Sequence, residues 1–339
     1  MNVESRAEIE RLSALVRGFS GRRVVVVGDL IADQFVSGEI SRVSREAPVM
    51  ILRHERTETV PGGAANCAMN LAALGARAAI VGVVGGDAAG RALCERLEGA
   101  GVDCSGVFVP PGHSTTTTKV RILAGHAHST RQQVVRLDYE SEVPKDEVVL
   151  AALASNVREA FERAEAAIIS DYNYGVACEA TVEPLLRAKG RVPVVVDSRF
   201  RMREFEGFDS ATPNEDEVEQ VAGRLLAGAA ELAAEGERLR AELGYRALLV
   251  TRGKHGMLLL EEGKSPLQLE AVGSHDAVDV TGAGDTVIAT YTLALAAGAD
   301  HATAARLANH AGGVVVLKRG TACVHPHELL ASLEHEGQV

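Results

Sequence analysis

Short apolar runs alternate with stretches of helical periodicity along most of this chain. The run RVVVVG at residues 23–28 is β-branched and ends in Gly-Asp, which is typical of a buried strand that enters a loop. Further strands are expected at 78–83, near Val107, and at 166–170, 192–197, 247–251 and 256–271. Helices are expected at 62–74, 88–100, 145–163, 178–189, 283–297, 301–317 and 326–335. This alternation predicts crossover connections and a mostly parallel sheet between layers of helices.

Two segments depart from this alternation. Residues 35–60 and 115–138 alternate polar with apolar positions, the first contains Pro48, and the second has a turn signal at 124–129. We expect them to form a small β lid over one end of the sheet. Before the first strand, Ile9, Leu12 and Val16 fall at helical spacing, which predicts a docking helix within residues 1–21. Residues 22–339 then form one large α/β domain with its lid.

Composition narrows the class of protein. Hydrophobic residues make up 46% and charged residues 24%, as in soluble globular proteins, and the absence of Trp leaves a core of Val, Leu, Ile and Ala. The formal net charge of −11 argues against general nucleic-acid binding. The five cysteines are scattered without a CxxC pair, and the charged first twenty residues lack the apolar stretch of a signal peptide. We therefore expect a cytoplasmic protein without a disulfide framework or zinc knuckle.

The segment DVTGAGDT at 279–286 precedes an apolar helix. Gly282 and Gly284 let the backbone approach a ligand closely, and the first amides of a helix attract an anion. A carboxylate at Asp285 would repel a phosphate unless it had its own task, and taking the proton from an attacking hydroxyl is such a task. The alternative is a glycine turn followed by an Asp that favours the helix dipole.

Two further segments suit a polyhydroxy ligand. PGGAAN at 61–66 has paired glycines, Gly62 and Gly63, and Asn66 offers both a donor and an acceptor. Tight packing of a small-residue helix on a sheet explains the same letters. Asp33 follows the first strand at its carboxyl end, where open α/β sheets place their sites, although it could equally be a surface acid.

Phosphate or metal chemistry is suggested by two more segments. In TPNEDE at 212–217, Asn214 and Glu217 would share a helix face and could organise magnesium, or Asn214 could simply cap the helix. TRGKHG at 251–256 could accept nucleotide phosphates or make a hairpin. GKS at 263–265 lacks the first glycine of a phosphate loop, and no GxGxxG opens a helix. The HxH pairs at 126/128 and 325/327 lack a third ligand and are interpreted as surface histidines.

Together these motifs resemble the PfkB, or ribokinase-like, carbohydrate kinase family over residues 22–327. The resemblance implies a three-layer α/β kinase that uses ATP and Mg²⁺, with Asp285 as base and the backbone of Gly282, Ala283 and Gly284 as anion hole. It implies sugar contacts from Asp33, Gly62, Gly63 and Asn66, and a magnesium and phosphate role for Asn214 and Glu217. It also implies an ATP site at Thr251, Gly253 and Asn309, and a monovalent-cation shell, for K⁺, at Asp279, Thr281 and Gly320.

Within the family, SRVSREAPV, VRLDYE and SDYNYG are similar to the heptose 7-phosphate kinase branch, which phosphorylates the anomeric hydroxyl of D-glycero-β-D-manno-heptose 7-phosphate. This chain departs from the branch in having Tyr174 in place of an expected Lys, and Asp197-Ser198-Arg199 in place of DPK. The nucleotidyltransferase domain fused to some of these kinases does not fit in the remaining residues, so we expect the kinase step alone. Related kinases pair their lids, which predicts a homodimer.

The second departure suggests a hypothesis about the substrate. Arg199, Arg201 and Arg203 alternate after a strand, so they would share a face if extended, and one or more could grip a substrate phosphate. A solvated basic turn is the alternative. Two other functions stay open at this point: a kinase for another sugar, sugar phosphate or nucleoside, and a non-catalytic sugar or nucleotide sensor on a kinase fold.

Overall fold

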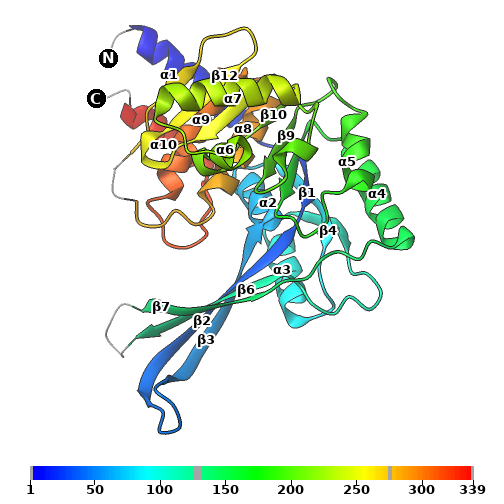
Figure 1. Ribbon diagram of the computed structural model, residues 1–339. Coiled ribbons are helices and arrows are strands. Elements are labelled where there is room, and N and C mark those ends of the chain that lie inside the picture. The colour runs from blue at the N-terminus through cyan, green and yellow to red at the C-terminus, as the bar shows by residue number, and fades with distance from the viewer. Residues whose placement is uncertain (1–2, 126–130, 274–276, 337–339) are drawn as a thin grey trace.

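Among the residues that the computed structural model describes, 3–125, 131–273 and 277–336, nine strands form one sheet in the order β13-β12-β11-β10-β9-β8-β1-β4-β5 (Figure 1). From β11 to β5 in that order, neighbouring strands are parallel. Strand β12 pairs antiparallel with β11, and β13 pairs antiparallel with β12. Their bounds are β1 Arg23–Gly28, β4 Arg77–Val83, β5 Asp103–Phe108, β8 Ala166–Asp171, β9 Val194–Ser198, β10 Ser210–Ala211, β11 Ala247–Thr251, β12 Met257–Glu261 and β13 Leu267–Leu269. The predicted mostly parallel sheet is confirmed.

Helices cover both faces of this sheet. One layer holds α1 Val3–Arg17, α2 Ala64–Ala73, α3 Ala88–Gly99, α8 Ala283–Ala296, α9 His301–Val315 and α10 Pro326–Glu336. The other holds α4 Glu147–Phe161, α5 Glu179–Leu186, α6 Glu215–Ala222 and α7 Ala229–Leu243. The sequence of β1 is continuously apolar because both of its faces are buried. Val24 and Val26 pack in the core under the first helix layer, whereas Val25 and Val27 pack in the core under the second. The three-layer architecture is therefore a direct consequence of two-sided burial.

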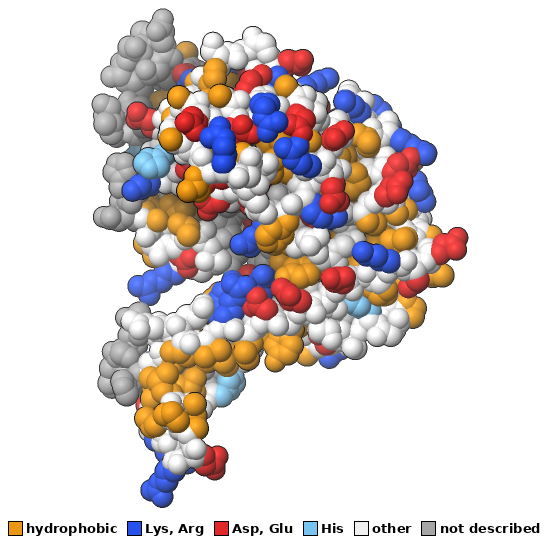
Figure 2. Space-filling model, viewed as in Figure 1, with side chains coloured by type: hydrophobic (Ala, Val, Ile, Leu, Met, Phe, Trp, Pro, Cys, Tyr) orange, Lys and Arg blue, Asp and Glu red, His pale blue; other side chains and the backbone are white. Residues whose placement is uncertain are grey.

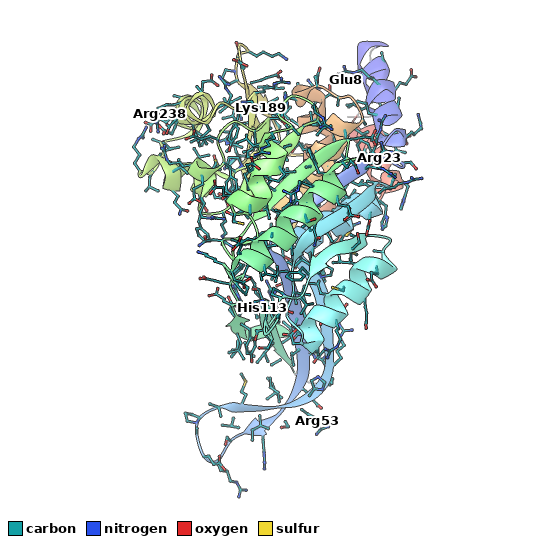
Figure 3. All side chains as sticks on the ribbon, turned by 90° about the vertical axis from the view of Figure 1, so that its right-hand side faces the viewer. Glu8, Arg23, Arg53, His113, Lys189 and Arg238 are labelled. Atoms are coloured by element: carbon teal, nitrogen blue, oxygen red, sulfur yellow. The ribbon has the colours of Figure 1, made fainter. Side chains whose placement is uncertain are left out.

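The lid is a second sheet of order β3-β2-β6-β7, made of β2 Leu30–Val43, β3 Met50–Gly63, β6 Thr118–Gly125 and β7 Gln132–Tyr139. Strands β2 and β6 are parallel and the two outer pairs are antiparallel. Arg53 lies at the far end of the lid, whereas Arg23, at the start of β1, lies at the opposite end of the molecule (Figure 3). The carboxyl ends of the parallel strands thus point toward the lid, and this end of the sheet is where α/β folds bind ligands.

Three details differ from the sequence-based expectations. The helix expected from Gly62 begins at Ala64, because Gly63 adopts φ 57° and ψ −133°, outside the helical region. Helix α7 was not among the expected elements; it is largely charged, and its narrow apolar stripe of Leu232, Leu239 and Leu243 gives a weak periodic signal. Most of the turn expected at 124–129 lies outside the described residues, as do His126 and His128.

No helix in the described part of the chain has both the length and the apolar character needed to cross a membrane.

Candidate active site

A cavity of about 360 Å³ opens between the lid and the carboxyl ends of the central strands. Asp285 lies on its wall in the first turn of α8, and Asp33 lies on the lid side. Of the residues singled out from the sequence, the cavity is lined by Asp33, Gly62, Gly63, Arg199, Asn214, Glu217, Thr251, Thr281, Gly282, Gly284 and Asp285. Asp33 and Asp285, which are 252 positions apart in the chain, therefore meet at one site.

Asp285 is buried and held by three side chains. Its Oδ2 accepts a hydrogen bond from Asn66 Nδ2 at 2.7 Å, and its Oδ1 accepts from Tyr172 Oη at 3.3 Å and from Cys67 Sγ at 3.5 Å. Burial raises the pKa of Asp285 to about 6, against these three hydrogen bonds, which lower it. Above that pH the carboxylate is ionised and can accept a proton, as a general base must.

Asn66 lies beneath Asp285 and does not line the cavity. Its side chain is 1% exposed, and its Oδ1 accepts a hydrogen bond from Asn70 at 3.2 Å. The sugar contact expected of Asn66 is therefore not available in this conformation, because its amide points at the Asp285 carboxylate. Its observed contacts make it a residue that positions the base.

The glycines at the end of β3 leave room for the site. A Cβ on Gly62 would lie 2.6 Å from Asp33 Oδ2, and one on Gly63 would lie 2.8 Å from the Asp29 carbonyl oxygen. Both approaches are too close for any side chain, so the Asp33 carboxylate can lie against the backbone only because residue 62 has none. Asp33 is also ion-paired with Arg121 from β6, which joins two strands of the lid at the cavity.

The start of α8 has the geometry of an anion site. Gly282 adopts φ 76°, and a Cβ there would lie 2.6 Å from Asn66 Nδ2. Nothing described lies within 4 Å of the Cβ position of Gly284, so its backbone faces open space. Of the three amides expected to form the anion hole, that of Ala283 donates to the Val280 carbonyl at 3.2 Å, which turns it away from a ligand.

Two carboxylates that line the cavity, Asp197 and Glu217, repel each other. Burial raises the pKa of Asp197 well above its usual value, and the charge of Glu217 adds to the rise; burial likewise raises the pKa of Glu217. Asn214 caps α6: its Oδ1 accepts from the Glu217 amide, and Glu217 Oε2 accepts from the Asn214 amide. Asn214 thus caps α6 and also lines the cavity, and the Glu217 carboxylate lies at the cavity wall.

These oxygens suit magnesium. Desolvated carboxylates with raised pKa values are stabilised by a cation, and Mg²⁺ usually takes one or two protein carboxylates together with water and phosphate oxygens. In the described ranges no group of three or more His, Cys, Asp or Glu side chains could hold a metal alone. Asp197 and Glu217 thus fit a magnesium ion that keeps most of its ligands from water and nucleotide.

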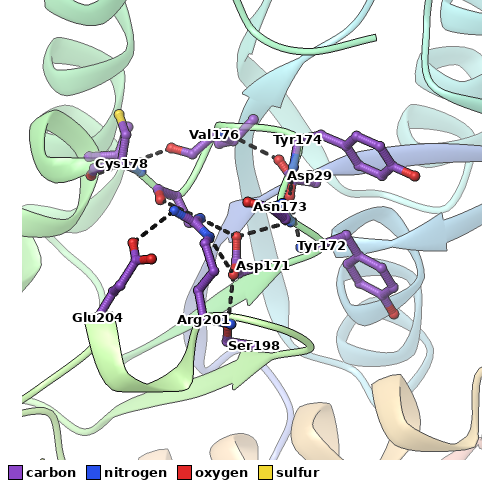
Figure 4. Close-up of polar contacts among 12 residues, drawn as sticks. Asp29, Asp171, Tyr172, Asn173, Tyr174, Val176, Cys178, Ser198, Arg201 and Glu204 are labelled. Carbon is purple, nitrogen blue, oxygen red and sulfur yellow. Dashed lines mark hydrogen bonds and ion pairs between the residues drawn. The ribbon is translucent and has the colours of Figure 1, made fainter. Parts of the chain in front are cut away.

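The three alternating arginines have different surroundings. Arg199 lines the cavity, whereas Arg201 is ion-paired with the buried Asp171 and donates to the Ala177 carbonyl at 2.9 Å (Figure 4). Arg203 pairs with Glu242 on α7. The expectation that the three share one face is wrong, because a short 3-10 turn at Met202–Glu204 replaces the extended backbone that it required.

The loop carrying Tyr172 is held from below by Asp29. Its carboxylate accepts hydrogen bonds from the backbone amides of Tyr172, Tyr174 and Val176 at 2.8, 3.0 and 3.1 Å (Figure 4). Tyr174, which stands where Lys was expected, donates its hydroxyl to Glu140 at 3.0 Å. The same loop therefore presents one tyrosine to Asp285 and the other to the end of the lid.

A second cavity of about 200 Å³ adjoins the first and shares Thr251, Val280 and Gly284 with it. Its walls are mainly small and apolar, and they include Gly253, Ala283 and Asn309 from the sequence-based set. Asn309 donates Nδ2 to the Glu270 carbonyl at 2.6 Å. A narrow apolar cavity beside a polar one suits a planar base whose phosphates extend toward Asp285.

The cation shell expected at Asp279, Thr281 and Gly320 is partly assembled. Asp279 accepts from the backbone amides of Thr281 and Gly320, each at 2.9 Å, so the three residues lie together beside the start of α8. His325 and His327 stack with ring centroids 5.8 Å apart and belong to no metal cluster among the described residues.

Several cavity residues were missed in the sequence, namely Lys119, Arg121, Arg136, Tyr172 and Asp197. Lys119, Arg121 and Arg136 have alternate or register-paired positions on β6 and β7. The two-residue periodicity of the lid strands would have placed them on one face. It would not have shown which face of the lid meets the cavity.

Comparison with known proteins agrees with this geometry. The family described as pfkB family carbohydrate kinase matches residues 22–327. Bifunctional protein HldE of Pseudomonas aeruginosa (strain LESB58) is 41% identical over 319 residues, which are 94% of this chain and 65% of that protein. HldE of Pseudomonas putida (strain W619) is 41% identical over 320 residues with the same shares. The chain thus spans 65% of the length of these curated relatives.

Solved structures show the same fold. Arabidopsis thaliana ribokinase, complexed with ribose and ATP, has a TM-score of 0.71 at 22% identity and covers 93% of this chain and 99% of its own. Phosphofructokinase-2 from Escherichia coli, in complex with substrates and products, has a TM-score of 0.73 at 20% identity with the same coverage. The ribokinase-like fold predicted from the sequence is confirmed.

Proposed function

The chain belongs to the pfkB family of carbohydrate kinases, and we propose that it transfers the γ-phosphoryl group of ATP to the anomeric hydroxyl of D-glycero-β-D-manno-heptose 7-phosphate. Sugar phosphorylation follows from the family, and the choice of heptose is supported by the similarity to HldE and to the heptose kinase branch. One observation carries the proposal: a buried carboxylate with a raised pKa lies at a helix start, where a polar and an apolar cavity join.

The proposed reaction uses both cavities. The adenosine occupies the apolar one, and its phosphates pass Thr251 and Gly284 toward the polar one. Asp285 takes the proton from the acceptor hydroxyl, whose oxygen bonds to the γ-phosphorus while the bond to the β–γ bridging oxygen breaks and ADP leaves. The α8 dipole and the exposed backbone at Gly284 stabilise the charge that accumulates on the phosphoryl oxygens.

Two cations fit beside this path. Asp197 and Glu217 would hold Mg²⁺, which neutralises phosphate charge during transfer. Asp279, with Thr281 and Gly320, would hold a K⁺ ion next to the start of α8. Replacing K⁺ by Na⁺ in the assay should then lower the rate, and equal rates in the two salts would contradict the K⁺ assignment.

We also propose a homodimer through the lid. Val135, Leu137 and Tyr139 alternate with the cavity-facing Arg136 on β7 and are about half exposed, and Figure 2 shows hydrophobic side chains gathered over the lid strands. A second copy carries the same face and can cover it symmetrically. Leu137→Glu should shift the native mass from dimer to monomer, and a wild-type monomer at micromolar concentration would contradict the proposal.

The five cysteines are unpaired in the structure, which is compatible with a reducing cytoplasm, where ATP is also supplied. We therefore propose a cytoplasmic enzyme.

The test of the kinase assignment is product identification by phosphorus NMR with a panel of heptose, hexose and pentose phosphates. Wild type should convert heptose 7-phosphate to the 1,7-bisphosphate, and Asp285→Asn should lower kcat by about 10²- to 10⁴-fold because the base is lost. Asp103→Asn, an exposed carboxylate far from the cavity, is the matched control and should keep wild-type kcat. Equal turnover in wild type and Asp285→Asn would remove the assignment of Asp285 as the base, and a wild type that turns over none of the acceptors would favour a non-catalytic sensor.

A further inference from the structure

Four basic side chains line the polar cavity. Lys119, Arg121 and Arg136 come from the lid, and Arg199 comes from the loop after β9 in the body. Figure 2 shows Lys and Arg side chains on both sides of the hollow between lid and body. A concentration of positive charge is unexpected in a chain of net charge −11 and calls for an anionic partner.

Two of these four cations already have a partner. Arg121 is ion-paired with Asp33, and Arg136 contacts Asp138 through both Nε, at 2.7 Å, and Nη2. These pairs account for two positive charges. They leave Lys119 and Arg199 as the cations whose charge the protein does not balance by contact.

Lys119 forms no hydrogen bond or ion pair through its ammonium group with any residue that the structure describes. Burial lowers the pKa of Lys119, and the neighbouring charges of Arg136 and Arg199 lower it further, against the attraction of Asp138 and Asp33. A half-buried ammonium in such a place is stabilised by an anion that approaches from the cavity.

Arg199 is likewise unpaired among the described side chains. Its guanidinium lies over the Phe200 ring, 5.6 Å from the centroid, and forms no ion pair within 4.0 Å. Its guanidinium lines the polar cavity, where its fork is available to a planar or tetrahedral anion.

We infer that Lys119 and Arg199 form a binding subsite for a phosphomonoester on the acceptor sugar, with one cation from the lid and one from the body. This inference rests on the proposed kinase function and adds the reason why a phosphorylated sugar is preferred. The phosphate neutralises two cations that repel each other across the cavity. It thereby holds the lid against the body while transfer takes place.

The position of the lid cations assigns this subsite to the acceptor and not to the nucleotide. Lys119 pairs in register with Asp33, at the sugar side of the cavity. No lid residue lines the apolar cavity where the nucleotide base is proposed to bind. An anion that touches Lys119 therefore lies beside the lid in the polar cavity and outside the apolar one.

The test compares two acceptors, heptose 7-phosphate and the same heptose without phosphate. In Lys119→Ala and in Arg199→Ala, the preference for the phosphorylated acceptor, expressed as a ratio of kcat/KM values, should fall about tenfold or more, because a charge-assisted contact is lost. The KM for ATP should change much less than the KM for heptose 7-phosphate. Arg199→Lys should recover part of the preference.

The matched controls each remove a basic side chain that does not line the cavity. Arg203→Ala, whose guanidinium pairs with Glu242, and Lys145→Ala, an exposed lysine, should keep the wild-type ratio. Should an alanine variant fold poorly, calorimetric titration of Lys119→Gln with heptose 7-phosphate gives the same comparison.

Three outcomes would overturn the subsite: an unchanged ratio in both alanine variants, an equal rise in the KM values for ATP and acceptor, or a wild type that accepts both sugars equally well. The last result would leave the kinase assignment intact. A wild type that phosphorylates no sugar would instead refute the proposed function itself.

Discussion

The two joined cavities are built from opposite kinds of side chain. The larger one is lined by charged groups from the lid and from the ends of the central strands, and the smaller one by glycines and small apolar residues of α8, α9 and the hairpin after β11. A charged wall can select an acceptor and move a proton, whereas an apolar slot binds a planar base by burial alone. Chemistry and nucleotide affinity should therefore respond to different substitutions.

Among substitutions that keep Asp285 itself, the largest effect is expected where this carboxylate receives its shortest hydrogen bond. Asn66→Ala removes the donor at 2.7 Å, and a hydrogen bond to a charged group contributes about 1.5–3 kcal/mol, so kcat should fall about 10- to 100-fold. The lost donor stabilised the ionised form, so the pKa of Asp285 should rise above about 6. In a plot of kcat against pH, the acid limb should then move to higher pH.

The control for Asn66→Ala is Asn156→Ala on α4, whose amide donates to the Gly106 carbonyl far from the cavity. It should leave the pH profile in place. A lower kcat in Asn66→Ala with an unmoved acid limb would show that Asn66 does not act through Asp285.

An intermediate effect is expected in the apolar cavity. A Cβ on Gly312 would lie 3.4 Å from Val287 and 3.8 Å from Met257, both on the cavity wall, so Gly312→Leu should fill the slot. The KM for ATP should rise about tenfold, by loss of roughly 1.4 kcal/mol of binding, while the KM for the sugar changes little. Gly312→Ala, which meets only ordinary contacts, is the control. Equal rises for both substrates would break the division between the cavities.

The smallest effect is expected at Tyr172. The charge of Asp285 and burial raise the pKa of Tyr172, so its hydroxyl stays protonated and donates at 3.3 Å. Tyr172→Phe removes this longer bond, and the acid limb should shift upward by less than in Asn66→Ala, with a kcat loss of about twofold to fivefold. Tyr174→Phe, whose hydroxyl contacts Glu140, is the control. Superimposable pH profiles of kcat for Tyr172→Phe and wild type would show that Tyr172 does not affect the pKa of Asp285.

Local pattern was sufficient for the parts of the site that lie within one turn or one strand end. The placement of Asp285 in the first turn of an apolar helix, with Gly282 before it, follows from adjacent residues and needs no tertiary information. The same holds for the glycine pair before α2, whereas Asp33 lies within the lid strand β2 and not at the carboxyl end of β1, where the sequence pattern predicted it. In the first two cases backbone geometry and short-range periodicity dictate the outcome.

Roles that depend on a distant partner could not be predicted. Asn66 was expected to meet the sugar, yet it contacts a carboxylate 219 positions away. Arg199, Arg201 and Arg203 look equivalent in the sequence, and only Asp171 and Glu242 decide which of them remains at the cavity. Lys119 gave no signal because the face that a lid strand turns to the body is set by sheet register.

The sequence by itself determined most of the order of strands and helices along the chain, the two-sided burial of the sheet and the helix start that carries Asp285, since these depend on side-chain periodicity and glycine backbone freedom. Only the tertiary structure decided which cations reach the cavity, which residues set the pKa of Asp285 and where the polar cavity meets the apolar one. Those features arise from long-range packing, in which a burial change or a one-residue register shift alters every contact at once.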